Sequence, residues 1–331
     1  MHRSLRSAED LVEAGLVTAD AAPALTQVSE RYSISVTPLV ARLIGEHGAP
    51  LARQYIPSAE ELVTAPHELD DPTADAPFTP IKGVVHRYPD RALLKPLLAC
   101  PVYCRFCFRR EAVGPGGGLL GEAELEAALD WFARTPQVRE AILTGGDPLM
   151  LSPRRLRHIL TRLAAIPHIE TLRIHSRVPV ADPDRVDAAM LDALTLEKPL
   201  YLCVHANHAA EFAPESHAAL RALHGAGAVL LGQSVLLRGV NDSGAALEDL
   251  FRAMLRNRIK PYYLHQLDAA PGTARFHVPV EEGLALLRGL RGRVTGLAWP
   301  TYVQERPAGG GKFPLGMEAM HPGTGQAPQG E

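Results

Sequence analysis

Residues 92–110 read ALLKPLLACPVYCRFCFRR, and this stretch holds three of the chain's four cysteines within eight residues. Cys100, Cys104 and Cys107 form the pattern C-x3-C-x2-C directly after an apolar run that predicts a buried strand. Three thiolates on one short loop can bind three irons of a cubane iron–sulfur cluster, which leaves the fourth iron to a small molecule. A structural zinc site and inert or redox-active cysteines are the alternatives. Zinc usually takes four ligands, however, and Cys203 belongs to a different expected strand, where a core cysteine is the simplest interpretation.

Short apolar runs alternate with helix-like segments along the next part of the chain. Five runs follow the first one, at residues 140–146, 171–176, 200–206, 229–237 and 260–267. Such alternation predicts a mainly parallel sheet covered by helices, and six units favour a barrel or partial barrel over an open doubly wound sheet. Ser152 followed by Pro153 is a typical helix start in this pattern. Functional residues of such barrels lie at the C-terminal ends of strands, which here carry CPVYCRFC, TGGDP, HSR, HANH, GQS and HQLD.

The two ends of the chain differ from this α/β pattern. Ser7 is expected to cap a helix, and apolar residues at helical spacing predict a helical region over about the first 70 residues. The Pro- and Asp-rich segment 67–80 predicts an extended linker, and the Gly-rich end predicts a partly disordered loop. We therefore expect three parts: a helical region with its linker (1–75), an α/β barrel (76–305) and a C-terminal segment with a flexible tail (306–331).

Composition narrows the functional classes. The 331 residues include 34 Lys and Arg against 37 Asp and Glu, a formal net charge of −3, which argues against bulk nucleic-acid binding. No stretch approaches the roughly 18 uninterrupted apolar residues of a membrane span, and the N-terminus does not match a signal peptide. Four cysteines are too few for a disulfide scaffold. We expect a cytoplasmic protein that acts on a small molecule.

The ordered motifs resemble those of the lysine 2,3-aminomutases, a family of radical S-adenosylmethionine (SAM) enzymes. The resemblance spans about residues 68–315 and rests on CRFCFRR, TGGDPL, RIHSRVPV, GQSVLLRGVND, KPYYLHQLD and PTYV followed by PAGGGK. It implies a partial (β/α)6 TIM-like barrel, an isomerase with a [4Fe–4S] cluster, SAM and pyridoxal 5′-phosphate (PLP), and a 1,2-amino shift that converts L-lysine to β-lysine. It also implies an electron donor such as flavodoxin or ferredoxin, and it leaves a homo-oligomer open.

The resemblance assigns cofactor roles to particular residues. Cys100, Cys104 and Cys107 would hold the cluster, with SAM on the remaining iron. Lys312 in GGGK would attach PLP, although alone this motif is most simply a flexible linker with a solvated lysine. The residues expected near PLP are Arg87, Tyr88 and Arg91, whose two arginines can clamp a phosphate or else lie on the surface. The residues expected to contact SAM are Gly145, Gly146, Asp147, Ser176, Arg177, His205 and Gln233.

Two histidines stay outside the expected site. His175 and His208 are equally explained as hydrogen-bonded structural histidines. Similarly, GGDP alone would be an ordinary turn before the helix that Ser152 caps, and it gains a role in SAM binding only from its place after the second strand.

Substrate recognition is the sharpest implication of the resemblance. Arg109 would pair with the substrate α-carboxylate, a task that suits a planar guanidinium. Asp242 and Glu305 would bind the ε-ammonium, because two acids facing one buried site are costly unless a cation joins them. Glu305 stands where the catabolic enzymes have Asp, and it matches the shorter relatives that make (R)-β-lysine for elongation factor P.

Two other functions remain open from the sequence. The same chemistry could act on another amino acid such as glutamate, which should demand a basic or neutral residue at position 242 or 305. A non-catalytic iron–sulfur or zinc-binding scaffold would have no need of Lys312.

Overall fold

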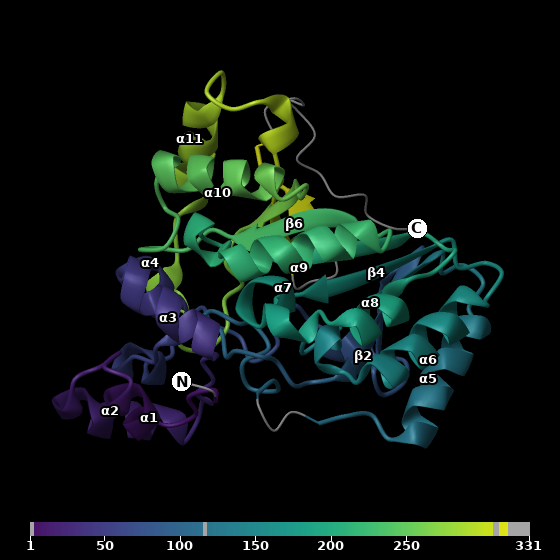
Figure 1. The fold of residues 1–331 in the computed structure, drawn as a ribbon, viewed down its shortest axis with the longest axis horizontal. Coiled ribbons are helices and arrows are strands. Elements are labelled where there is room, and N and C mark those ends of the chain that lie inside the picture. The colour runs from purple at the N-terminus through teal and green to yellow at the C-terminus, as the bar shows by residue number, and fades with distance from the viewer. Residues whose placement is uncertain (1–2, 115–117, 307–310, 317–331) are drawn as a thin grey trace, which may run out of the picture.

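Among the described residues, nine strands form one sheet, and their order in space is their order along the chain. The computed structural model describes residues 3–114, 118–306 and 311–316 (Figure 1). The strands are β1 (Val84–Tyr88), β2 (Arg91–Leu97), β3 (Glu140–Gly145), β4 (Thr171–Ser176), β5 (Leu200–His205), β6 (Val229–Val235), β7 (Lys260–His265), β8 (Thr301–Arg306) and β9 (Gly311–Pro314).

The strands from β2 to β8 run parallel, and β1 and β9 are antiparallel additions at the two ends of the sheet. Parallel neighbours joined through helices are the arrangement of a β/α barrel. All six expected strands are present as β2 to β7, which confirms the partial barrel. The strands β1, β8 and β9 were not anticipated.

Helices follow most of the parallel strands and lie along the outside of the sheet, while α1 to α4 gather at one end of the molecule (Figure 1). The side chains of Ser7 and Ser152 accept hydrogen bonds at the starts of α1 and α6, which confirms both expected caps. The α-helices are α1 (Ala8–Glu13), α2 (Ala22–Ser29), α3 (Pro38–His47), α4 (Ala49–Tyr55), α5 (Glu122–Ala133), α6 (Pro153–Ala164), α7 (Val178–Ala181), α8 (Ala188–Leu194), α9 (Pro214–Gly225), α10 (Gly244–Arg256) and α11 (Val280–Leu290). In the described part of the chain, no helix is long and apolar enough to cross a membrane.

The N-terminal helices hold the cysteine loop in place. Their apolar core includes Val102 from that loop. Glu61 forms ion pairs with Arg105 and Arg110, which lie on either side of Cys107 in the sequence, and all three side chains are fully buried. Breaking a buried ion pair of this kind costs about 3–5 kcal/mol. The helical region is therefore part of the support of the cysteine loop and does not merely precede the barrel.

The segment expected to be a linker packs against the barrel. The Glu68 carboxylate accepts hydrogen bonds from the backbone N–H groups of Gly272, Thr273 and Ala274, at 2.7–2.9 Å. The Asp71 carboxylate accepts from two N–H groups of the turn that carries Asp75, both at 2.9 Å. Acidic side chains readily fix turns in this way. Segment 67–80 therefore has a composition typical of linkers but is ordered against the barrel.

The two end strands meet through one hydrogen bond. The backbone N–H of Lys312 on β9 donates to the Tyr88 hydroxyl on β1 at 2.6 Å. Gly311 has φ +63°, and a Cβ there would collide with the same hydroxyl, so the position requires glycine. This contact places Lys312 beside β1. The expected flexible tail lies largely outside the described residues, as do 307–310 before β9.

Candidate active site

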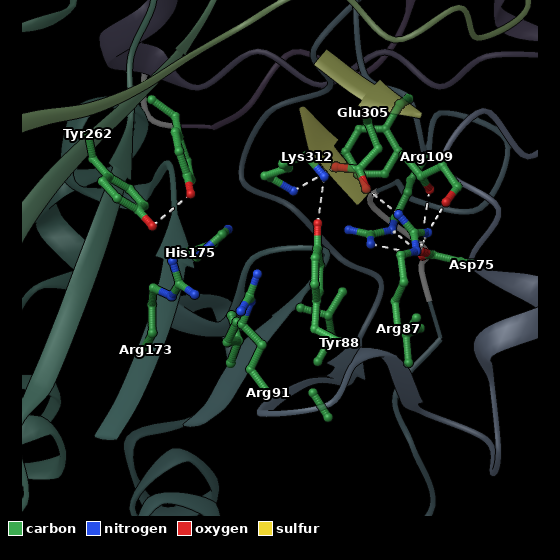
Figure 2. A pocket seen from close by; sticks show the side chains of 17 residues that line it. Asp75, Arg87, Tyr88, Arg91, Arg109, Arg173, His175, Tyr262, Glu305 and Lys312 are labelled. Atoms are coloured by element: carbon green, nitrogen blue, oxygen red, sulfur yellow. Dashed lines mark hydrogen bonds and ion pairs between the residues drawn. The ribbon is translucent and has the colours of Figure 1, made fainter. Parts of the chain in front are cut away.

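Two cavities lie side by side in the barrel. The first, which we call the cysteine cavity, lies at the C-terminal ends of the strands and is lined by Cys100, Cys104 and Cys107 among others. The second, the arginine cavity, lies against β1 and β2 and the inward side chains of β4 and β7 (Figure 2). Four residues with reactive or charged side chains line both cavities, namely Arg109, His175, Glu305 and Lys312. These four mark the place where the cavities meet.

The three cysteine thiols of the motif lie free and together in the cysteine cavity. Burial raises the pKa of each thiol, and it raises the pKa of Cys104 to about 11. Iron therefore has to replace a proton at each sulfur. Among the described residues, no group of three His, Cys, Asp or Glu side chains is placed to hold a single metal ion. A cubane instead takes one thiolate for each iron.

Gly145 and Gly146 form the cavity wall next to the cysteine loop. Gly145 has φ +113°, and a Cβ there would lie 2.6 Å from the Leu97 carbonyl oxygen. A Cβ at Gly146 would collide with the Ala99 carbonyl oxygen. Only glycine permits so close an approach of two backbones, and both residues line the cavity, while their contact with SAM stays a prediction.

Asp147 and Ser176 also line the cysteine cavity, but they are bonded to protein groups. The Ser176 hydroxyl donates to Asp147 Oδ1 at 2.8 Å. The backbone N–H groups of Arg177 and Val178 donate to Asp147 Oδ2 at 2.6 and 3.1 Å. Asp147 thus joins the ends of β3 and β4 and caps α7. The geometry gives it a positioning role, and a direct contact with SAM stays a prediction.

Arg177 is buried and surrounded by protein acceptors. Its guanidinium pairs with Glu211 at 2.5 Å and donates to the Tyr55 hydroxyl at 2.9 Å. A further N–H donates to Cys104 Sγ at 3.5 Å. The expected contact with SAM remains untested, whereas the contact with a cluster ligand was not anticipated.

His205 and Gln233 line the cysteine cavity from β5 and β6, as expected. His205 is partly buried, and its buried Nε2 atom has no hydrogen-bond partner among the described residues. Burial lowers the pKa of His205 well below its usual value, so the imidazole is neutral. Gln233 accepts a hydrogen bond from Cys203, whose complete burial confirms a core cysteine.

The arginine cavity carries a surplus of positive charge. Two carboxylates line it, Asp75 and Glu305, against five cationic side chains, which are Arg87, Arg91, Arg109, Arg173 and Lys312. Arg91 also pairs with Asp90 at 2.7 Å and Arg173 with Glu140 at 2.9 Å, so the surplus is one of the lining side chains. The three residues expected near PLP are therefore in this cavity, where Arg91 lies over the Tyr88 ring at 3.7 Å. Surplus cations beside a tyrosine hydroxyl suit a phosphate or a carboxylate.

Several residues of this cavity were missed from the sequence. Arg173 projects inward from β4, and Tyr262 and Tyr263 lie on β7, where the Tyr262 hydroxyl donates to that of Tyr263 at 2.9 Å. His175 lies two residues after Arg173 on the same strand, and its Nε2 atom has no described partner. Alternation along β4 was the available signal, because residues two apart on a strand face the same way.

Lys312 and Glu305 lie at the junction of the cavities. Lys312 Nζ forms an ion pair with Glu305 Oε2 at 2.8 Å, and Glu305 Oε1 pairs with Arg87 (Figure 2). The two residues are opposite each other in the register of β8 and β9. The strand pair thus places an amine and a carboxylate where both cavities can reach them.

Arg109 also lies at the junction, and it is bound to Asp75. Its Nε and Nη2 atoms donate to Asp75 Oδ2 at 3.2 and 2.9 Å, and Lys95 approaches the same carboxylate at 3.4 Å. Burial alone would raise the pKa of Asp75, but Arg109, Lys95 and Arg87 together lower it to about 2. Asp75 is therefore ionised. Its contact with Arg109 shows that the junction of the cavities can bind a carboxylate.

The structure does not bring Asp242 to Glu305, contrary to the prediction that both bind the ε-ammonium. Asp242 lies in the turn after β6, pairs with Arg238 at 3.1 Å and accepts from the Gly239 N–H, and it lines neither cavity. Its sequence, Asn-Asp-Ser, behaves as an ordinary turn. Asp268, at the end of β7, is the acid that lies with Glu305 in the cysteine cavity. Burial raises the pKa of Asp268 to about 7, against the effect of nearby Lys312.

Comparisons with known proteins agree with this arrangement. A model of the radical SAM superfamily matches residues 94–250. The L-lysine 2,3-aminomutase of Fusobacterium nucleatum subsp. nucleatum is 37% identical over 94% of this chain and 74% of its own length. The L-lysine 2,3-aminomutase of Clostridium subterminale is 37% identical over 94% of this chain and 75% of its own. The glutamate 2,3-aminomutase of Clostridioides difficile is 33% identical over 88% of this chain and 69% of its own.

Proposed function

The chain belongs to the lysine 2,3-aminomutase family of radical SAM enzymes and is an isomerase, and on this premise we propose that it converts L-lysine to β-lysine. Membership of the family implies a [4Fe–4S] cluster, SAM and PLP as cofactors. The reaction moves the α-amino group of lysine to C3, and a hydrogen atom moves from C3 to C2, so no atom is gained or lost.

The cysteine cavity fits a cluster and SAM. Three free thiols on one loop would hold three irons. The remaining wall supplies backbone at Gly145 and Gly146 and the unpartnered Nε2 atom of His205, which are suitable contacts for the polar groups of SAM. Gln233 would contribute an amide on the same side. A one-electron donor such as flavodoxin or ferredoxin would reduce the cluster.

The arginine cavity fits PLP. Its surplus of cations matches a phosphate dianion, and the buried Nε atoms of Arg87 and Arg173 have no described hydrogen-bond partner. Arg91, Arg173 and the two β7 tyrosines would hold the phosphate. Lys312 would attach the cofactor, and Glu305 Oε2, at 2.8 Å from Nζ, can take up the proton that this amine must lose.

When bound, the cluster and SAM together supply the carbon radical that takes a hydrogen atom from C3 of the substrate, and PLP carries the amino group while it moves. The chain's own residues do the rest by positioning, which can account for many orders of magnitude in rate. Arg109, Glu305 and Lys312 line both cavities, so a substrate held by them lies between the two cofactor sites.

The distribution of charge at the junction of the cavities is the observation that supports lysine as the substrate. Arg109 already binds a carboxylate there, that of Asp75, and Glu305 already binds a lysine ammonium, that of Lys312. Asp268 adds a second acid near Glu305. A molecule with a carboxylate at one end and an ammonium at the other, which is free lysine, satisfies both places.

We further propose that the product serves the modification of elongation factor P. The support is the glutamate at position 305, which the chain shares with the short (R)-β-lysine-forming relatives that it resembles. The mass of elongation factor P from a strain that lacks this gene tests the assignment. Loss of the β-lysyl adduct is expected, and an unchanged mass would contradict it.

Glutamate is the second candidate substrate, because one of the similar proteins is a glutamate 2,3-aminomutase. Its side-chain carboxylate would have to lie beside Glu305 and Asp268, which disfavours it by charge repulsion. We therefore rank lysine first.

Anaerobic reconstitution tests the proposal. The purified chain is loaded with iron, sulfide and PLP, then incubated with SAM, dithionite and L-lysine labelled with deuterium at C3. We expect β-lysine that carries the label at C2. A full cluster with neither β-lysine nor transfer of the label would overturn the lysine assignment, and β-glutamate from a parallel reaction would favour the second candidate.

A further inference from the structure

Arg177 makes a contact that the amino-group shift does not require. Its Nη1 atom lies 3.5 Å from Cys104 Sγ, within the range of an N–H···S hydrogen bond. Its Nε atom donates to the Tyr55 hydroxyl at 2.9 Å, and its Nη2 atom donates to Gln54 Oε1 at 2.8 Å and to Glu211 Oε2 at 2.5 Å. Every nitrogen of the guanidinium therefore donates a hydrogen bond to a protein acceptor, and one of these acceptors is the sulfur of a cluster ligand.

The partners of Arg177 fix its orientation from two sides. Gln54 and Tyr55 end α4 in the N-terminal region, and the Tyr55 hydroxyl donates to Glu211 at 3.0 Å. Glu211 lies in the turn after β5, where it also accepts from the backbone N–H of Asn207 at 2.7 Å. The side chains of Arg177 and Glu211 are only 5% and 3% exposed. A buried network this well satisfied holds its members in one geometry.

We propose that Arg177 raises the reduction potential of the iron–sulfur cluster by donating a hydrogen bond to Cys104 Sγ, with Glu211, Gln54 and Tyr55 as positioning residues. Hydrogen bonds to cluster sulfurs are one of the factors that set cluster potentials. An N–H directed at a thiolate stabilises the form that carries more negative charge, which is the reduced form. A biological one-electron donor would therefore reduce the cluster more easily.

The step that Arg177 influences is simple to balance. An external reductant gives one electron to the oxidised [4Fe–4S]2+ cluster and forms [4Fe–4S]+. No bond is made or broken, and no proton moves at Arg177. The step involves no amino acid, so this inference goes beyond the proposed function and does not depend on which substrate is used.

The first test is a redox titration of the reconstituted full chain followed by electron paramagnetic resonance, without SAM, PLP or lysine. Arg177→Gln combined with Glu211→Gln removes the buried ion pair as a unit, so neither charge is left unpaired. At equal iron and sulfide content, we expect a lower midpoint potential than that of the native chain. An unchanged potential would overturn the proposal.

A second variant separates the hydrogen bond from general damage to the site. Glu211→Gln alone keeps Arg177 and leaves its positive charge less compensated, so the midpoint potential should rise. Opposite shifts in the two variants are not expected from a loosened structure. Shifts of the same sign in the two variants would contradict the assignment. If the double variant fails to retain a cluster, an unchanged potential in Glu211→Gln alone would still contradict it.

A matched control uses an arginine–glutamate pair at the opposite end of the barrel strands. Arg139 and Glu170 pair at 2.6 Å, are mostly exposed and precede the N-terminal ends of β3 and β4, opposite the cavity. Changing both to Gln should leave the potential as it is. Because no amino acid is present, a negative result would leave the lysine assignment intact, and failure to form β-lysine would not affect the measured potential.

Discussion

The cysteine cavity and the arginine cavity share Arg109, Glu305 and Lys312, yet their charges are arranged in different ways. The cysteine cavity is balanced, because Arg109, Arg177 and Lys312 face three acids, Asp147, Asp268 and Glu305. The arginine cavity has five cations and two acids. The lining of one cavity is therefore balanced, and that of the other has more cations than acids, with Asp90 and Glu140 pairing with Arg91 and Arg173 from outside the lining.

This difference shows how one barrel can serve two kinds of cofactor. In the cysteine cavity, buried pairs such as Arg177 with Glu211 stiffen the walls around a cluster that the thiolates themselves hold. In the arginine cavity, the surplus charge attracts a phosphate and a carboxylate. Variants should therefore damage one cavity and spare the other, and the following four are arranged by expected size.

Lys312→Ala should have the largest effect. Without the amine that attaches PLP, the amino shift should fall by roughly three orders of magnitude or more, because an unattached cofactor loses its positioning. Iron content and dithionite-driven cleavage of SAM should remain, since they belong to the cysteine cavity. Mass spectrometry after borohydride reduction, with exposed Lys82→Ala as the control, reports the attachment. PLP still bound covalently in Lys312→Ala would place the attachment at another residue.

Arg109→Lys should have the next largest effect. A charged hydrogen bond is worth about 1.5–3 kcal/mol, so KM for lysine should rise roughly 10- to 100-fold when the planar fork becomes a point charge. The iron content should not change. Steady-state kinetics measures the effect, and Arg139→Lys on the exposed side is the matched control. An unchanged KM would remove Arg109 from substrate binding.

Asp268 should make lysine binding depend on pH. Burial raises the pKa of Asp268 to about 7, so the acid is protonated and neutral at pH 6 and ionised at pH 8. Only the ionised form attracts an ammonium, and KM for lysine should therefore fall as the pH rises through 7. Asp268→Asn should have a raised KM without this dependence, whereas Asp242→Asn should behave as the native chain. A flat profile in the native chain would contradict the role of Asp268.

Gly146→Ala should give the smallest of these effects, and it should be on stability. A Cβ would collide with the Ala99 carbonyl oxygen beside the first cysteine, and overpacking of this kind costs about 1–3 kcal/mol. The melting temperature should drop by several degrees, together with the iron content. Gly225→Ala, where a Cβ meets no atom within 4 Å, should not lower either value. A melting temperature of Gly146→Ala equal to that of the native chain would show that the backbone around residue 146 can accommodate a Cβ.

Local patterns explain what could be predicted from the sequence. The cysteine loop, the six strands from β2 to β7 and the caps of α1 and α6 are each specified by residues close together in the chain. Lys312 beside Arg87 was also expected, but only through the resemblance to the family. Their place in one cavity depends on β1 and β9, two short end strands that no periodicity indicated.

The missed residues depend on long-range geometry. The strand end HQLD was noted, but which strand-end acid lies near Glu305 follows from β7 pairing with β8 in the sheet. Asp75 was hidden in a composition typical of linkers, and only the Asp71 turn directs it to Arg109. Arg173 lies two residues before His175 on β4, so the alternation of that strand could have indicated it.

A competition reaction tests the central claim most directly. The reconstituted chain is given equal concentrations of L-lysine and L-glutamate with SAM, PLP and dithionite, and the two β-amino acids are quantified by mass spectrometry. The charges at the junction predict β-lysine as the dominant product, with the preference reduced in Asp268→Asn. A product mixture dominated by β-glutamate would contradict the account.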